Sequence, residues 1–246
     1  MCAVIHEIGY FPSKRNLTIY RYMDFDKFES VLNDSSLYFA RADKFKDKNE
    51  GHLPDKYYDK KYVQKQFRCD EETAKAEARF NKILAGRKRN IFISCWSCGS
   101  SESDALWNLF TKTSRGIVIK SNVQSLRNVL DKADGDFLIS RVKYFNPKNF
   151  RQNINQYWHS HVHKSHIYRH EQELRALFFQ IQPPKNRCGF KITVDLDELV
   201  HRIIIHPKMH KTFIKDLCNL LKGHPKLEKR LVTSSAYYNP VTEKLF

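Results

Sequence analysis

Long apolar runs and an export signal are both missing from this sequence of 246 residues. No apolar stretch approaches the roughly 18 residues that a membrane-spanning helix needs, so we expect no such helix and no membrane partner. The first ten residues contain Glu7 in a short apolar stretch, with no basic region before it, and this pattern is not that of a secretory signal. We therefore expect the chain to work in the cytoplasm, with its six cysteines as reduced thiols.

The sequence also lacks the usual signatures of several enzyme and binding-protein classes. It has no Gly-x-Gly-x-x-Gly after a predicted strand and no Walker-type phosphate loop, the motifs by which Rossmann and P-loop proteins hold nucleotides. It has no His-Glu-x-x-His and no Gly-x-Ser-x-Gly, the motifs of zinc proteases and serine hydrolases. An RNA-recognition signature, a Cys2His2 finger and a basic region with heptads are absent too, so no standard nucleic-acid module is present.

Two groups of potential metal ligands lack the rest of a binding site. Cys95 and Cys98 form a Cys-x-x-Cys pair, but Cys188 and Cys218 are isolated, so a four-ligand zinc site is incomplete. Five histidines lie in or just after the polar stretch 149–166, which we predict to be a helix: His159, His161, His163, His166 and His170. A stripe of them along one helix face could bind a metal, but no carboxylate or thiolate except that of Glu171 completes the set. We therefore expect a polar surface helix and no metal.

Positive charge is the strongest feature of the composition. Lys and Arg number 43 against 27 Asp and Glu, which gives a formal charge of +16 at pH 7. The charge is spread along the chain, with concentrations at 56–65, 87–89 and 208–230. Such a surface attracts polyanions such as nucleic acids, acidic proteins or phosphate-rich ligands, but it is equally consistent with a solvated surface that has no single partner.

Strand and helix patterns alternate irregularly, which favours an α+β fold over a doubly wound sheet. The strand patterns cover 17–22, 36–39, 90–97, 115–120, 137–145, 173–181, 189–196 and 202–206. The helix patterns cover 24–33, 71–85, 103–111, 123–132, 149–166 and 207–221, and 50–68 is loop-like with one helical turn. We expect 173–181 and 189–196 to pair with each other. No repeat and no linker divides the chain, so we predict one domain over 1–246, with 55–90 as a helical insertion.

Polar side chains occur on predicted core strands, where burial costs free energy unless the groups are paired or functional. They are Arg21 on the first strand, Ser94 and Ser97 on either side of Cys95-Trp96, and Glu171, Glu173 and Arg175 near 173–181. With a period of two, the last three share one face, which puts the two carboxylates about 7 Å apart. At that distance they shift each other's pKa and can share one ligand. The alternative is a ladder of salt bridges, with Glu173 paired to Arg175 or to Arg21.

The order of these motifs resembles a bacterial family of uncharacterised proteins that is known only as a domain of unknown function. The motifs of that family have the pattern Tyr-Arg-Tyr, Leu-Tyr-Phe, Phe-x-Asp-x-x-Glu-Gly, Ser-Cys-aromatic-Ser, Leu-Trp, Gly-Ile and Glu-x-Glu-x-Arg. Here they stand as Tyr20-Arg21-Tyr22, Leu37-Tyr38-Phe39, Phe45-Lys46-Asp47-Lys48-Asn49-Glu50-Gly51, Ser94-Cys95-Trp96-Ser97, Leu106-Trp107, Gly116-Ile117 and Glu171-Gln172-Glu173-Leu174-Arg175. The resemblance covers about 17–222, and it departs at Leu174, where the family has an aromatic, and at 56–89, which looks like an insertion.

The order of polar residues in that family is in turn similar to the Arg…Ser…Glu-x-Glu pattern of ADP-ribosyltransferases. This similarity implies a split, largely antiparallel sheet with peripheral helices, with NAD bound in the cleft between its halves. It implies Glu173, Glu171, Ser94 and Ser97 as catalytic residues, and Arg21, Tyr20, Tyr22, Glu50, Trp107 and Arg175 as NAD-binding residues. We expect no metal in this chemistry.

The chemistry explains why such a site needs these residue types. Breaking the nicotinamide–ribose bond builds positive charge on the ribose. A carboxylate under the sugar, here Glu173, would stabilise that charge by about 3–4 kcal/mol, and Glu171 would orient the acceptor. The guanidinium of Arg21 suits the pyrophosphate, because it holds phosphate oxygens with two parallel N–H groups. Ser94 or Ser97 would orient Glu173 or the ribose, and aromatic rings on the same strands would stack on nicotinamide or adenine.

Three functions from different classes remain open at this point. The resemblance favours an NAD-dependent ADP-ribosyltransferase of the toxin or antiviral defence type, whose acceptor is a nucleic acid, a protein or, in an NAD glycohydrolase, water. Its partners would be NAD, an RNA or DNA acceptor, and an antitoxin or other partner protein. The first alternative is a non-catalytic nucleic-acid-binding domain that uses its basic surface. The second is a metal-dependent nuclease built on the histidine cluster, which a chelator would inactivate.

Overall fold

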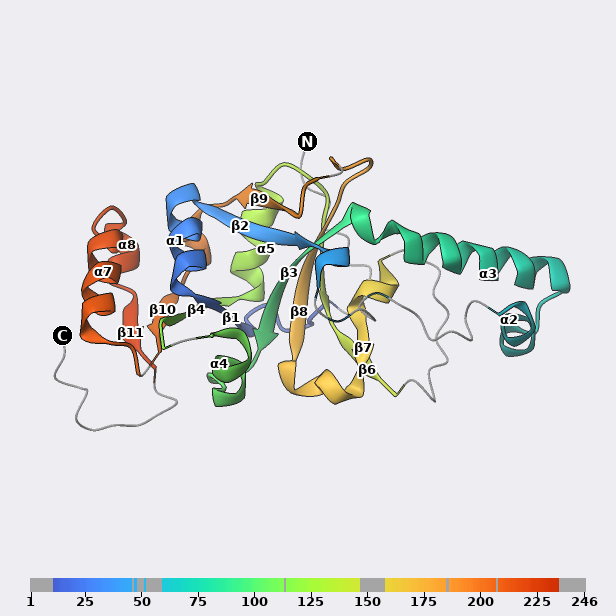
Figure 1. The fold of residues 1–246 in the computed structure, drawn as a ribbon, viewed down its shortest axis with the longest axis horizontal. Helices are drawn as coiled ribbons and strands as arrows, with labels where there is room; N and C mark the ends of the chain where they lie inside the picture. The colour runs from blue at the N-terminus through green and yellow to red at the C-terminus, as the bar shows by residue number, and fades with distance from the viewer. Residues whose placement is uncertain are drawn as a thin grey trace.

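The computed structural model describes residues 11–45, 47, 51, 59–112, 114–146, 158–184, 186–206 and 208–234. Over these residues the chain is a mixed α+β protein, with one large and mostly antiparallel sheet, helices around it and a small second sheet (Figure 1). The predicted α+β class, the largely antiparallel sheet and the peripheral helices are thereby confirmed. None of the described helices is long and apolar enough to cross a membrane. The single domain and the insertion at 55–90 stay predictions.

The large sheet is built around β3 (Ile91–Cys98). Its strand order is β11-β10-β4-β1-β3-β2-β9, with β8 paired to β3 and β5 paired to β8. The other strands are β1 (Thr18–Asp24), β2 (Ser36–Arg41), β4 (Gly116–Asn122), β5 (Phe137–Arg141), β8 (Glu173–Phe179), β9 (Gly189–Thr193), β10 (Arg202–Ile205) and β11 (Leu231–Thr233). Among the described pairs of this sheet, β10 and β11 are parallel and the rest are antiparallel.

The sheet divides at β3. On one edge, β3 pairs with β8 over residues 91–97. On the other edge, β2 pairs with residues 92–93 near the start of β3, and β1 pairs with residues 97–98 at its end. β1 and β2 therefore diverge from each other, and residues 94–96 of β3 have no described strand beside them on that edge.

Helices surround the sheet, and most of them bury the apolar core against it. They are α1 (Phe25–Asp34), α2 (Lys60–Phe67), α3 (Glu71–Gly86), α4 (Asp104–Phe110), α5 (Val123–Asp131), α6 (Leu196–Leu199), α7 (Lys211–Leu221) and α8 (Pro225–Glu228). α1 and α5 each bury four apolar side chains at helical spacing, and these pack on strand residues such as Phe92 and Ile119 in the main core. α1 connects β1 to β2 and ends at Ser35, whose left-handed backbone (φ 43°) turns the chain directly into β2. The two diverging strands are thus joined directly by this helix.

Two strand predictions are wrong in their pairing. β8 and β9 do not form a hairpin, because β8 lies between β3 and β5 whereas β9 pairs with β2 at the end of the sheet. All but the last residue of β8 is buried, as a central strand requires, and β9 is partly exposed throughout. The predicted strand 137–145 is two strands, β5 and β6 (Lys143–Phe145), and β6 pairs with β7 (His163–Ser165) in the small sheet.

The predicted helix 149–166 is wrong over its described part. Residues 147–157 lie outside the described residues, and the chain then forms the 3-10 turn η5 (His159–Val162), the strand β7 and the 3-10 turn η6 (His166–Glu171). Trp158 and Val162 are buried here against β3 and β5 residues. This segment is therefore held by packing on the sheet, and it is not a polar surface helix.

Two helical regions also differ from the sequence prediction. α2 forms where a loop with one helical turn is predicted, and it packs on α3 through Val63, Ala74 and Ala78, away from the main sheet (Figure 1). α7 begins at Lys211 after the cap residue His210, and Pro207 lies outside the described residues.

Candidate functional site

A pocket of about 500 Å³ opens where β1 and β2 diverge from each other along one edge of β3. Most of its lining is aromatic or apolar, including Tyr20, Tyr22, Tyr38, Trp96 and Phe110. Its charged lining residues are Arg21, Lys27, Lys191 and Glu173. A largely apolar cavity of this size with a few converging polar groups is the usual form of a small-molecule site.

Arg21 bridges the gap in the sheet. Its guanidinium donates to the carbonyl oxygen of Tyr38 on β2 (2.8 Å) and to the Oγ of buried Ser94 on β3, and it lies 5.7 Å from the ring centre of Trp96. Burial lowers the pKa of Arg21 to about 10, so the group is still a cation at neutral pH. Its other N–H groups have no partner among the residues that the structure describes, which leaves them available to an anionic ligand.

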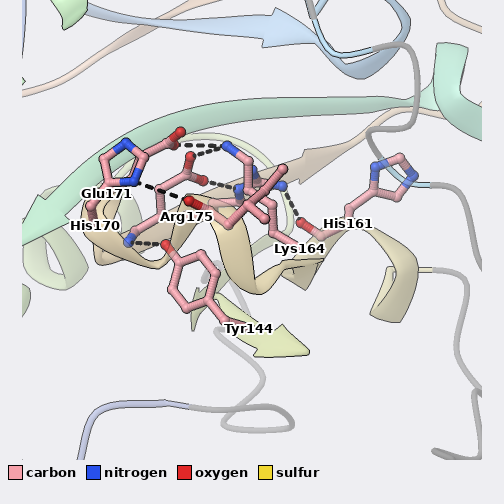
Figure 2. Close-up of polar contacts among 8 residues, drawn as sticks. Tyr144, His161, Lys164, His170, Glu171 and Arg175 are labelled. Carbon is pink, nitrogen blue, oxygen red and sulfur yellow. Dashed lines mark hydrogen bonds and ion pairs between the residues drawn. The ribbon is translucent and has the colours of Figure 1, made fainter. Parts of the chain in front are cut away.

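Glu173 belongs to a buried cluster of four charged groups, of which Lys164, Glu171 and Arg175 are labelled in Figure 2. Lys164 on β7 contacts Oε1 of Glu173 (2.9 Å) and Oε2 of Glu171 (2.7 Å). The Nε of Arg175 contacts Oε2 of Glu173 (2.5 Å), and its guanidinium also donates to the carbonyl oxygen of His161 (2.6 Å). Glu171, Glu173 and Arg175 are each no more than 5% exposed. The cluster therefore fixes the small sheet against β8 and holds the Glu173 carboxylate in one orientation.

The two carboxyl groups of the cluster differ in their affinity for a proton. Burial, a hydrogen bond with Glu173 and the charge of Glu173 raise the pKa of Glu171 to about 7, against the opposing effect of Lys164. Burial also tends to raise the pKa of Glu173. The charge of Arg175, the hydrogen bond from Glu171 and the charge of Lys164 outweigh burial and hold the pKa of Glu173 well below its usual range. At neutral pH Glu173 is ionised, and Glu171 carries the shared proton part of the time.

The raised pKa of Glu171 predicts how the free energy of unfolding depends on pH. Between its ordinary pKa of 4.5 and the folded value of about 7, the unfolded chain has released this proton and the folded chain still holds it. The free energy of unfolding should therefore fall as the pH rises through this window, by at most about 1.4 kcal/mol per pH unit. Glu173 acts outside the window, because its lowered pKa adds stability that is lost only as the pH falls below about 4.5.

Urea unfolding of the wild type and of Glu171→Gln at pH 5 and pH 7.5 measures this effect. The wild type should lose stability between the two pH values relative to Glu171→Gln. Glu228→Gln, an exposed change on α8, should behave as the wild type does. The same pH dependence in Glu171→Gln and in the wild type would contradict the assignment.

Several of the residues predicted from sequence converge on the pocket. Its lining includes Tyr20, Arg21, Tyr22, Ser97 and Glu173, which come from β1, β3 and β8. They meet because Tyr20, Ser97 and Glu173 are successive register partners across these three antiparallel strands. Ser94 does not line the pocket, and it acts on it only through its hydrogen bond with Arg21.

Three other predicted residues, all among those that the structure describes, do not line the pocket. Trp107 is fully buried, donates from Nε1 to Glu102 (3.1 Å) and packs edge-on against Tyr22. Arg175 is buried behind Glu173, in the cluster. Glu171 ends the 3-10 turn η6 and is not on β8, because Gln172 takes a left-handed conformation (φ 43°), so the predicted alternation starts only at Glu173. Glu50 lies outside the described residues.

Sequence reasoning missed several residues that complete the site. Lys164, which binds both carboxylates, stands among histidines in a stretch with a helical pattern, so no signal marks it as a partner of Glu173. Tyr144 accepts a hydrogen bond from the backbone N–H of Glu173 (2.8 Å), and a predicted continuous strand 137–145 hides this role. Tyr38 could have been found, since it belongs to the quoted Leu-Tyr-Phe motif and is the exposed residue within it.

The two groups of potential metal ligands are dispersed in the structure. Cys95 and Cys98 are three residues apart on β3 and so point to opposite faces of the sheet. His161 and His163 are buried, and burial lowers the pKa of His163 to about 4, whereas His166 and His170 are exposed. Among the described residues, no group of three or more His, Cys, Asp or Glu side chains is arranged to hold a metal ion.

Comparison with known proteins adds no relative to this description. The chain matches no family model, no curated protein and no solved structure. The functional interpretation therefore depends on the geometry of the pocket.

Proposed function

We propose that the pocket binds NAD and that the protein is an ADP-ribosyltransferase of the toxin or antiviral defence type, or an NAD glycohydrolase. The observation that carries the proposal is the meeting of Arg21 and Glu173 in one pocket at the division of the sheet. Tyr20, Ser97 and Glu173 are neighbours across β1, β3 and β8, so about 5 Å separates each from the next. The resemblance to ADP-ribosyltransferases implies NAD in a cleft between the halves of a split sheet, with Arg21 and Glu173 among the residues of the site.

The cations and aromatic rings of the pocket suit the pyrophosphate and the bases of a dinucleotide. Arg21 is a rigid cation with N–H groups directed by its contacts to Ser94 and Tyr38, and a pyrophosphate accepts from such a group in two parallel hydrogen bonds. Lys27 and Lys191 are exposed lining residues and add positive charge. The rings of Tyr22 and Phe110, 6.3 Å apart, offer faces on which an aromatic ring of the ligand can stack.

Glu173 supplies the electrostatic part of the proposed reaction. When the bond between nicotinamide and ribose breaks, nicotinamide leaves with the electron pair, and positive charge develops on the ribose. The ionised carboxylate of Glu173 stabilises that charge. An oxygen of the acceptor, or of water, then bonds to the ribose carbon and gives up its proton. At neutral pH the Glu171–Glu173 pair lacks its shared proton part of the time, and in that state it can take up the proton of the acceptor.

Incubation with NAD tests the proposal by the nicotinamide that is released. We expect release by the wild type and a KM for NAD about tenfold higher in Arg21→Lys, because lysine keeps the charge but loses the paired N–H groups. The kcat should change less than KM. Arg202→Lys, an exposed change on β10, is the matched control and should leave both constants as they are. Absence of release by the wild type would refute the proposed activity, and an unchanged KM in Arg21→Lys would refute the role of Arg21.

The charge of +16 favours a second candidate, a nucleic-acid-binding domain without catalysis. It predicts an affinity for RNA or DNA that falls steeply with salt, together with no release of nicotinamide. The two candidates are therefore separated by the same NAD assay.

A further inference from the structure

A second hollow lies next to the NAD pocket and has different chemistry. It has a volume of about 700 Å³ and is formed by residues 13–18 before and at the start of β1, residues 98–100 at the end of β3, Arg141 at the end of β5, and Gln172. We call it the β1–β3 groove. Tyr20 connects the two sites, because it lines the NAD pocket and its hydroxyl donates to the carbonyl oxygen of Ser100 in the groove (3.3 Å).

The lining of the groove, as far as the structure describes it, is basic and contains no carboxylate. Lys14, Arg15 and Arg141 are exposed, and among the described residues none of their side chains has a hydrogen-bond or ion-pair partner. The other polar lining residues are Ser13, Asn16, Thr18, Ser100 and Gln172, all neutral. Cys98 lies at the buried side of the groove, and burial raises the pKa of its thiol to about 11, so it adds no negative charge. Three cations with neutral donors and no acid are the lining expected for phosphate groups.

Backbone hydrogen bonds hold the walls of the groove in place. The amide of Gln124 on α5 donates to the carbonyl oxygen of Arg15 (3.0 Å), which fixes the turn that carries Lys14 and Arg15. The amide of Gly99 donates to the carbonyl oxygen of Thr18 (3.3 Å). The amide of Cys98 donates to the carbonyl oxygen of Gln172 (2.8 Å). The cations therefore project from a fixed frame, which lowers the entropy lost when a ligand orders them.

We propose that the β1–β3 groove binds the sugar-phosphate backbone of a single-stranded nucleic acid. None of the described residues that line it is aromatic, so bases have no ring to stack on there, and the contacts fall on phosphate and sugar. The aromatic rings are in the adjoining NAD pocket, which an unpaired nucleotide next to the groove can approach and a base inside a duplex cannot. If the proposed NAD chemistry is correct, and this step rests on it, the nucleic acid in the groove is the acceptor of the ADP-ribosyl group.

Binding of fluorescent 12-nucleotide RNA and DNA single strands tests the groove without NAD. We expect binding to single strands in preference to a duplex of the same sequence. A triple variant, Lys14→Gln with Arg15→Gln and Arg141→Gln, should bind at least about tenfold more weakly at 0.1 M salt. Its slope of log affinity against log salt should be smaller by about 2, since each phosphate contact to a single strand contributes about 0.7.

The matched control removes the same charge elsewhere. Lys211→Gln with Lys215→Gln and Lys222→Gln neutralises three exposed lysines of the α7 region, and it should change the affinity less than threefold. Equal losses in the two triple variants would show an effect of net charge only and overturn the proposal, as would failure of the wild type to bind or a preference for duplex. Binding that depends on the groove in a protein that releases no nicotinamide would uphold the groove and refute the NAD activity.

Discussion

Replacement of Glu173 by glutamine should lower the kcat for nicotinamide release by about 10²–10³-fold, equivalent to about 2.7–4 kcal/mol of lost transition-state stabilisation. The side chain keeps its size but loses the only described negative charge that lines the pocket. The KM for NAD should change little, because positive charge on the ribose exists in the transition state and not in the bound substrate. Steady-state rates over a range of NAD concentrations separate the two constants.

Glu171→Gln is the informative comparison for this experiment, since it makes the same chemical change in the same cluster but outside the pocket lining. Glu171→Gln should reduce the rate of nicotinamide release much less than Glu173→Gln does. Within Glu171→Gln itself, transfer of the ADP-ribosyl group to an acceptor should be reduced more than the release of nicotinamide. Glu228→Gln controls for loss of a carboxylate as such. Thermal unfolding of each variant shows whether the cluster is still assembled. Equal rates for the folded Glu173→Gln variant and the wild type would exclude Glu173 from the chemistry.

The strands and helices of this fold could be predicted where one side of an element is buried. α1 and α5 show helical spacing of Phe, Val and Leu, and β3 is an almost uninterrupted apolar run, so their places in the sequence are confirmed within one or two residues. The pairing of strands could not be predicted in the same way. β8 and β9 follow each other in the chain, but the partners of β8 are β3 and β5, and nothing in its apolar sequence distinguishes these from β9.

In the candidate site, too, the polar residues could be predicted from the sequence but their partners could not. A polar residue on a core strand indicates that a partner exists, and so Arg21, Ser94 and Glu173 could be singled out from the sequence. The identity of the partner depends on the tertiary structure. Ser94 accepts from Arg21, whereas Glu173 is bound by Lys164 of the small sheet, a residue in a segment with the wrong predicted structure. The predicted salt-bridge alternative is therefore right in part, since Glu173 is paired with Arg175.

Replacement of Arg175 by methionine should cost up to about 3–5 kcal/mol of the free energy of unfolding at pH 8, the usual cost of removing one partner of a buried ion pair, and leaves Lys164 as the remaining cation at Glu173. Arg175 is 1% exposed and lies in the middle of β8, where water cannot replace its contact with Glu173. Methionine fills much of the same volume, so the cost comes from charge more than from packing. Urea unfolding measures it, with Arg169→Met, an exposed change on η6, as the control.

The pH dependence of this variant distinguishes lost charge from lost packing. Arg175 is the largest of the effects that lower the pKa of Glu173, and without it burial should raise that pKa. At pH 5 the carboxyl group can then take up a proton, the buried charge disappears, and the deficit relative to the wild type should be smaller than at pH 8. The double variant Arg175→Met with Glu173→Gln should recover part of the loss at pH 8, because it removes both charges. A deficit that is the same at both pH values and in the double variant would mean that Arg175 acts by packing alone, and that Glu173 owes its ionised state to Lys164.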